Sequence, residues 1–279
     1  MDRYLSTINS YPVSYAVYSS LSFFGPHTGG ELPGRWFVAA LGRVGHDAAA
    51  VRQTLWRMER SGELAGRMEG RQRFYRFTPL ARAEARLGLA RIMDPLPRGW
   101  AGQWTIVHLR FSSRQRMARE RVVAALHAGG FRNPMPGVFL HPRAQVGEIE
   151  SIASEVGPEH VMVFRGRRAG GPNDGAFVRG LWDVDGLARR YRAFLITWQA
   201  DSRRRKWRGE EAFAARFALV FSYLDIAWHD PELPATLLPA RWPGGRARLM
   251  ARQLYRRLQP EALQLSQTLL GASKASVTA

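Results

Sequence analysis

The stretch AAAVRQTLWRMERSG, residues 48–62, runs directly into ELAGRMEGRQRFYRFT, residues 63–78, and the two together indicate the architecture of the N-terminal part. In the first stretch, Val51, Leu55 and Met58 are spaced four and three residues apart, which places them on one face of a helix. The aspartate before it is a good N-cap, and the glycine that ends it is a natural stop. The second stretch alternates polar and apolar residues around a glycine, so we predict a β-hairpin.

Two further helices are predicted before this stretch, over residues 13–24 and 35–42, with a glycine-rich loop over 27–34 between them. The order helix, helix, turn, helix, hairpin is that of a winged helix-turn-helix. We therefore predict a winged helix-turn-helix DNA-binding domain over residues 1–98, in which a last helix covers residues 81–93.

The face of the 48–62 helix opposite its apolar seam carries long polar side chains and a tryptophan. Arg and Gln can form paired hydrogen bonds with base edges in the major groove, and arginines on a hairpin suit phosphates or the minor groove. The alternatives are a solvated helix face and, for the tryptophan, packing against the first helix. The candidate DNA-binding residues are Arg52, Gln53, Trp56, Arg57 and Arg60 on the helix, and Arg67, Arg71 and Arg73 on the hairpin.

The prolines and glycines of residues 94–103 mark a boundary between domains. Beyond it, strands and helices alternate in an order that suggests a small ferredoxin-like α/β sandwich over residues 99–180. The predicted strands cover 104–111, 138–141 and 160–165, with room for another near 129–136 or 177–181, and the predicted helices cover 114–128 and 144–156.

Residues 181–279 are predicted to form a helical C-terminal domain. The expected helices cover 184–198, 210–227 and 244–272, with a break in the last one at Pro260. The fold class is thus α+β, in three consecutive domains.

Charge is the strongest compositional signal, because 41 Lys and Arg residues against 23 Asp and Glu residues leave a net charge of +18. Such an excess implies an acidic partner such as nucleic acid. The absence of cysteine excludes disulfides, thiolate chemistry and zinc fingers. Neither a bilayer-spanning stretch nor a secretory signal is expected, so we predict a cytoplasmic protein.

Enzyme motifs are missing from the sequence. The seven histidines lack the spacings of metal sites, and there is no GxSxG, Walker or GxGxxG motif, so we expect no catalytic residue, no metal and no cofactor. A basic run near residue 205 could instead bind the phosphates of an effector, although a solvated loop is the plainer interpretation. The candidate effector-binding residues are Arg203, Arg204, Arg205, Trp207 and Arg208.

Three segments resemble the PaaX family of transcriptional repressors of phenylacetate catabolism. The sequence EGRQRFYRFT in residues 69–78 resembles the family's "RGR-x-x-YRLT" wing. The sequence LWDVDGLARRYRAFL, residues 181–195, resembles its "LWDL…YR-FL" segment. The sequence WHDPELPATLLPARWPGGRARLMARQLYRRL, residues 228–258, resembles its C-terminal "RDP-LP-LLP-WPG-A" motif, with His229 where the family usually has arginine. The similarity covers essentially the whole chain.

This resemblance implies a homodimeric repressor that binds double-stranded operator DNA at aromatic-acid catabolism genes. It also implies release by an acyl-CoA inducer, an aryl-CoA such as phenylacetyl-CoA. The family's central domain resembles the Cas2 nucleases, which hold a metal through an acidic residue near the end of the first strand; TIVHLRFSS, residues 105–113, has none. A nuclease-like or RNA-directed enzyme and a ligand-free architectural DNA binder remain the alternatives.

Overall fold

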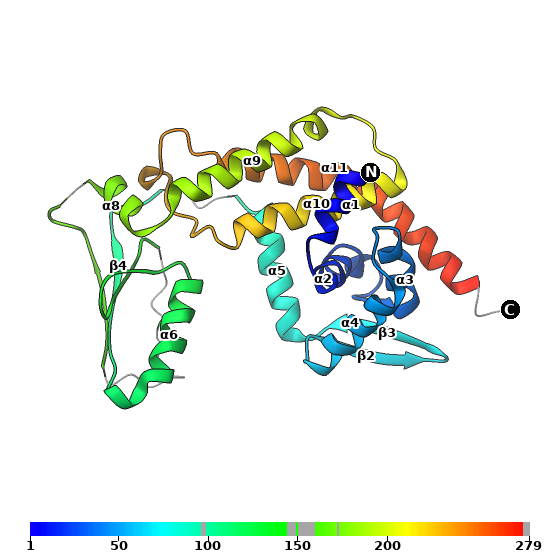
Figure 1. Cartoon of the computed structure of the whole chain (residues 1–279), viewed down its shortest axis with the longest axis horizontal. Helices are drawn as coiled ribbons and strands as arrows, with labels where there is room; N and C mark the ends of the chain where they lie inside the picture. Colours follow the sequence, from blue (N-terminus) through cyan, green and yellow to red (C-terminus); the bar gives the residue numbers. More distant parts are fainter. Residues whose placement is uncertain (96–98, 144–148, 150–159, 172, 276–279) are drawn as a thin grey trace. The chain divides into compact units, whose positions relative to one another are not determined.

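The residues that the structure describes form a mixed α+β protein in which two small antiparallel sheets stand among many helices (Figure 1). The computed structural model describes residues 1–95, 99–143, 149, 160–171 and 173–275. Contacts divide them into two compact units, each assembled from segments that are distant in sequence. The division into three consecutive domains stays a prediction. Unit 1 comprises residues 1–94, 193–227 and the described part of 246–279, and unit 2 the described parts of 95–192 and 228–245.

The N-terminal part of unit 1 contains the predicted helices and hairpin, with ends within two residues of the predicted ones. The segment 27–34, predicted as a loop, instead contains a short strand, and an additional helix precedes the predicted ones. The elements are α1 (Asp2–Asn9), α2 (Val13–Phe24), η1 (Gly25–His27), β1 (Glu31–Pro33), α3 (Gly34–Gly42), α4 (Ala48–Arg60), β2 (Leu64–Glu69), β3 (Gln72–Phe77) and α5 (Pro79–Met93).

Helix α4 begins and ends where its flanking residues require. The Asp47 carboxylate accepts hydrogen bonds from the backbone N–H groups of the second and third residues of α4, at 2.8 and 3.0 Å. These bonds lower the pKa of Asp47, because they stabilise its charged form. Gly62 follows the helix with a φ of +79°, a left-handed conformation that glycine adopts without strain. Local chemistry therefore fixes both ends of α4.

Strand β1 adds an edge strand to the hairpin, giving the antiparallel order β1-β3-β2. Leu32 of β1 lies opposite Tyr75 of β3, and Leu64 of β2 lies opposite Phe77. All four side chains are buried, so one face of this small sheet packs against the helices. Figure 1 shows the β2–β3 hairpin projecting beyond the helices of unit 1.

The C-terminal helices are α9 (Val184–Arg203), α10 (Gly209–Ala227) and α11 (Gly244–Ala275). The predicted break in the last helix is wrong, because α11 continues through Pro260. Proline removes one backbone hydrogen bond, but packing on both sides of it can hold a helix together. Leu254, Leu258 and Ala262 recur every four residues, and each is at most 1 % exposed. The same face of α11 is therefore buried before and after the proline.

The core of unit 1 is aromatic and joins the two ends of the chain. Phe24 of α2 has its ring centroid 5.4 Å from that of Trp36 in α3 and also 5.4 Å from that of Phe213 in α10. Trp36 is fully buried, and its Nε1–H donates to the backbone carbonyl of Ser266 in α11 at 3.2 Å. Helices α2 and α3 therefore rest on α10 and α11.

Arg216 of α10 is a charged residue within this core. It is 2 % exposed, and its guanidinium donates to the carbonyl of Tyr255 at 2.7 Å. The guanidinium carbon also lies 3.8 Å from the centroid of the Tyr255 ring and 4.6 Å from that of Phe23. Burial lowers the pKa of Arg216, and the two rings supply part of the stabilisation that water would otherwise give its charge.

Unit 2 contains a sheet in the order β5-β6-β4-β7, with all neighbouring strands antiparallel. In chain order this is 2-3-1-4, the order of a ferredoxin-like sheet, which fits the prediction. The additional strand lies at the first of its two predicted positions; the second is wrong, because residues there are helical. The helix predicted over 144–156 lies outside the described residues, apart from Ile149. The elements are β4 (Trp104–Arg110), η2 (Ser113–Gln115), α6 (Arg116–Ala128), β5 (Arg132–Met135), β6 (Val138–His141), β7 (His160–Gly166), α8 (Asp174–Leu181) and η3 (Ala235–Leu237).

His141 of unit 2 makes stability depend on pH. Its Nδ1 accepts a hydrogen bond from the backbone N–H of Arg143 at 2.9 Å, and burial lowers its pKa to about 4. Between that pH and the ordinary value near 6.5, only the unfolded chain binds the proton. The contribution of His141 is complete above about pH 6.5 and is lost as the pH falls to 4, by up to roughly 3 kcal/mol.

The His141→Gln variant isolates this contribution. We expect urea-unfolding midpoints of the wild type to fall between pH 7 and pH 4.5 more steeply than those of the variant. Parallel profiles would show that His141 is not the responsible group.

Candidate nucleic-acid interface

The candidate residues of α4 all lie on its solvent side. Val51, Leu55 and Met58 are at most 2 % exposed and fix the orientation of the helix. Trp56 is 56 % exposed, so it is not packed away against the first helix. The guanidinium carbon of Arg60 lies 4.8 Å from the centroid of the Trp56 ring, a cation–π contact on the surface. The exposed candidates on α4 are Arg52, Gln53, Trp56, Arg57 and Arg60.

Gln53, Trp56 and Arg60 form the outward face of α4, because spacings of three and four residues align side chains on a helix. A helix that presents amide, indole and guanidinium groups on one open face has the donors and acceptors that base edges in a major groove require. The hairpin follows α4 in the chain, separated from it by three residues.

The hairpin arginines differ in whether they form ion pairs within the protein. Arg67 donates to both carboxylate oxygens of Glu31, with its Nε 2.9 Å from one of them, and it also donates to Glu69. Arg73 pairs with Glu59 of α4, with an Nε–Oε2 distance of 3.1 Å. These bonds raise the pKa of both arginines, and the bond from Arg67 lowers the pKa of Glu31. The guanidinium groups of Arg67 and Arg73 are therefore already paired with carboxylates of the same chain.

Arg71 occupies the turn of the hairpin and is exposed. The part of the chain that the structure describes offers it no ion pair or hydrogen bond. Of the three hairpin candidates, Arg71 is therefore the one whose guanidinium is available to an external anion.

The Glu59–Arg73 pair lies directly over Gly66 of β2. A Cβ atom on Gly66 would lie 2.5 Å from Oε1 of Glu59 and 2.8 Å from Nε of Arg73. Carbon atoms do not approach oxygen and nitrogen so closely, so with a larger residue here the ends of these two side chains would have to shift. The bare backbone of Gly66 thus allows α4 and β3 to be linked across β2.

A groove of about 810 Å³ lies between α3, α4 and the hairpin. Arg35 of α3 lines it together with Arg52 of α4 and Arg71 of the turn. Its apolar lining includes Val38 and Phe74. Sequence reasoning missed Arg35, and the available signal was a positive charge in the first turn of the helix predicted over 35–42.

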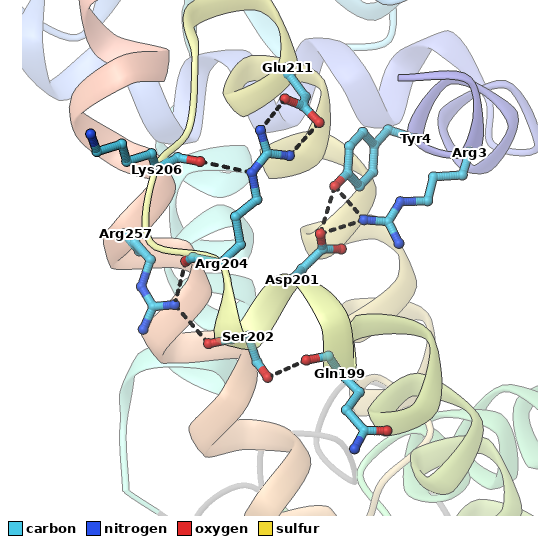
Figure 2. Close-up of polar contacts among 9 residues, drawn as sticks. All are labelled: Arg3, Tyr4, Gln199, Asp201, Ser202, Arg204, Lys206, Glu211 and Arg257. Carbon is cyan, nitrogen blue, oxygen red and sulfur yellow. Dashed lines mark hydrogen bonds and ion pairs between the residues drawn. The ribbon is translucent and has the colours of Figure 1, made fainter.

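Of the candidate effector residues, Arg203 ends α9 and the other four lie in the connector between α9 and α10. Their side chains have different partners. Figure 2 shows Arg204 pointing at Glu211, whose two carboxylate oxygens accept from it at 2.5 and 2.6 Å. The Arg204 guanidinium carbon lies 4.4 Å from the centroid of the Trp207 ring, and Trp207 is only 6 % exposed. Both side chains therefore make their contacts within the protein. The exposed candidates are Arg203, Arg205 and Arg208.

Helix α1 packs against the C-terminal end of α9, a feature that sequence reasoning missed. The Tyr4 hydroxyl donates to the buried carboxylate of Asp201 at 2.9 Å, and Arg3 pairs with the same carboxylate (Figure 2). Burial raises the pKa of Tyr4 to about 12, so the phenol stays protonated and able to donate. The ring of Tyr4 stacks on Trp198 at 5.8 Å between centroids. These contacts tie the N-terminus to the end of α9.

Within the described residues, no group of three or more His, Asp or Glu side chains is placed to hold a metal ion. None of the described helices is long and apolar enough to cross a bilayer.

Known proteins resemble this chain along most of its length. Family models described as PaaX-like protein, PaaX protein central Cas2-like domain, and PaaX-like protein C-terminal domain match residues 18–80, 97–178 and 182–268. The transcriptional repressor PaaX of Escherichia coli strain K12 is 25 % identical over 268 residues, covering 92 % of this chain and 84 % of the relative. An uncharacterized Mycobacterium tuberculosis protein of solved structure is 20 % identical, with a TM-score of 0.65, covering 92 % of this chain and 98 % of the other. At that identity the last likeness shows the fold alone.

Proposed function

This chain belongs to the PaaX family, and from that premise we propose that it is a transcriptional repressor that binds double-stranded operator DNA through a winged helix-turn-helix. In this proposal α4 is the recognition helix and β2–β3 is the wing. The genes it represses are those of phenylacetate-type aromatic-acid catabolism, and it acts in the cytoplasm. The observation that carries the proposal is the open, amide- and arginine-bearing face of α4 beside a projecting hairpin.

The proposed mechanism is release by an aryl-CoA inducer such as phenylacetyl-CoA. A homodimer holds two recognition helices at the separation of two operator half-sites. Binding of the inducer favours a state in which that separation no longer fits, so one half-site is lost. The loss of one half-site removes several kcal/mol, roughly a thousandfold in affinity.

Electrophoretic mobility shift on the DNA upstream of the gene tests this function. We expect a shifted band that phenylacetyl-CoA abolishes, and a dimer mass by sedimentation. Binding that no aryl-CoA affects would favour a ligand-free architectural DNA binder. Cleavage of DNA or RNA that a chelator stops would favour the nuclease-like alternative and overturn the non-enzymatic proposal.

The exposed arginines of the α9–α10 connector give a prediction about the inducer. Guanidinium groups bind phosphate through charge-assisted hydrogen bonds, and the phosphates of CoA are the most highly charged part of the inducer. We expect the double variant Arg205→Ala/Arg208→Ala to raise the phenylacetyl-CoA concentration for half-release about tenfold, roughly 1.4 kcal/mol. The measurement is fluorescence anisotropy of labelled operator during titration with the CoA ester.

The matched control is Arg246→Ala, an exposed arginine in the first turn of α11. This variant removes surface charge outside the connector, so the phenylacetyl-CoA concentration for half-release should stay unchanged. An equal shift in the control and the double variant would assign the effect to overall charge.

A further inference from the structure

The groove between α3, α4 and the hairpin combines positive charge with an apolar lining. Its one acidic lining residue, Glu69, already pairs with Arg67. Arg73 also lines the groove but is held by Glu59. Arg52 and Arg71 have no such partner among the described residues. The groove therefore presents uncompensated positive charge to whatever enters it.

Arg52 belongs to this groove more than to the outward face of α4. Arg52 and Glu59 are seven residues apart and so share one side of the helix. Glu59 reaches across to Arg73 of β3, which shows that this side faces the hairpin. Leu55, which also lines the groove, forms the inner end of the same side.

We propose that this groove holds the phosphodiester backbone of one DNA strand, with Arg52 and Arg71 as its phosphate contacts. The inference rests on the proposed function and adds to it a division of labour among the arginines. Guanidinium groups bind phosphate oxygens bidentately, and the two arginines come from two different elements that line one opening. The apolar side chains of Val38 and Phe74 suit the sugar carbons between phosphates.

Arg67 and Arg73 are positioning residues in this arrangement. Arg67 joins β2 to β1 through Glu31, and Arg73 joins β3 to α4 through Glu59. A phosphate could recruit either only by breaking an ion pair that already exists. Their ion pairs hold the hairpin, and with it Arg71, at a fixed place beside α4.

This arrangement determines which residues of α4 can distinguish one base pair from another. Contacts to phosphates fix the register of a protein on DNA but carry no direct sequence information. With Arg52 on the backbone, discrimination between base pairs falls to the outward face formed by Gln53, Trp56 and Arg60.

The salt dependence of binding to a random-sequence duplex tests the inference, because each lost phosphate contact lowers the slope of log affinity against log salt by about 0.9. The assay is anisotropy of a labelled 30-base-pair duplex, with the full chain, between 50 and 200 mM salt. We expect Arg52→Ala and Arg71→Ala each to lower the slope by about 1.8, because each variant loses one phosphate contact in both protomers of the dimer, and the double variant by about 3.6. Melting curves near that of the wild type establish that each variant is folded.

Two kinds of variant complete the test. Arg86→Ala removes an exposed charge from α5, away from the groove, and keeps the wild-type slope. Arg67→Ala and Arg73→Ala weaken binding by the same factor at every salt concentration, which leaves the slope unchanged. A drop of about 1.8 in Arg67→Ala or Arg73→Ala, or a wild-type slope in the double variant, overturns the inference. Failure of the wild type to bind any duplex would instead overturn the proposed function.

Discussion

Trp36→Ala is expected to lower the free energy of unfolding by about 3–5 kcal/mol. The Trp36 side chain is fully buried between Phe24 and Phe37, so its removal leaves a large cavity in the aromatic core of unit 1. It also removes the hydrogen bond to Ser266 that ties α3 to α11. Urea unfolding followed by circular dichroism measures the loss.

Two variants separate the causes of this effect. Trp36→Phe keeps most of the ring volume but loses the hydrogen bond to Ser266, so we expect a cost of about 1–3 kcal/mol. Trp56→Ala removes the exposed tryptophan of α4 and should change stability by no more than about 0.5 kcal/mol. Equal destabilisation by Trp36→Ala and Trp56→Ala would contradict the burial that distinguishes the two tryptophans.

The double variant Gln53→Ala/Arg60→Ala is expected to lose most of its sequence discrimination. Each side chain can form paired hydrogen bonds with a base edge, worth about 1–3 kcal/mol. Their joint loss costs about 2–6 kcal/mol at each half-site, at least roughly 30-fold in operator affinity. Selection of bound sequences from a random duplex pool identifies the operator, and anisotropy then compares it with random duplex.

Random duplex provides the internal control. Its binding depends on phosphate contacts, which this variant leaves in place, so its affinity should fall far less than that of the operator. Arg52→Ala should weaken both DNAs alike. If the double variant also weakened both DNAs alike, base reading would have to be assigned elsewhere on the protein.

The sequence was sufficient to predict α4 and the hairpin because their determinants are local. The capping aspartate, the apolar seam and the glycine stop all lie within a few residues of the element that they define. Strand β1 escaped prediction because it has three residues, ends in proline and follows two glycines. Its strand geometry is imposed by pairing with β3, some 40 residues later in the chain.

The sequence was sufficient to predict most residues of the candidate site, but not which of its arginines are already ion-paired within the protein. The outward residues of α4 follow from helical spacing alone. Glu69 lies two residues from Arg67, but Glu31, its partner on β1, lies 36 residues away, and Glu59, the partner of Arg73, lies 14 residues away. No local pattern reveals these two longer-range pairs. The partner of Trp36 is 230 residues away and could be found only from the folded chain.

Because unit 1 combines segments from both ends of the chain, it cannot fold completely until synthesis on the ribosome is nearly finished. Residues 1–94 emerge first, but the helices that cover Phe24 and Trp36 are synthesised after residue 208. Until then this segment carries uncovered aromatic side chains and needs protection from aggregation. Premature termination before α10 and α11 should therefore release an unstable fragment and not a free DNA-binding module, which couples repression to completion of the polypeptide.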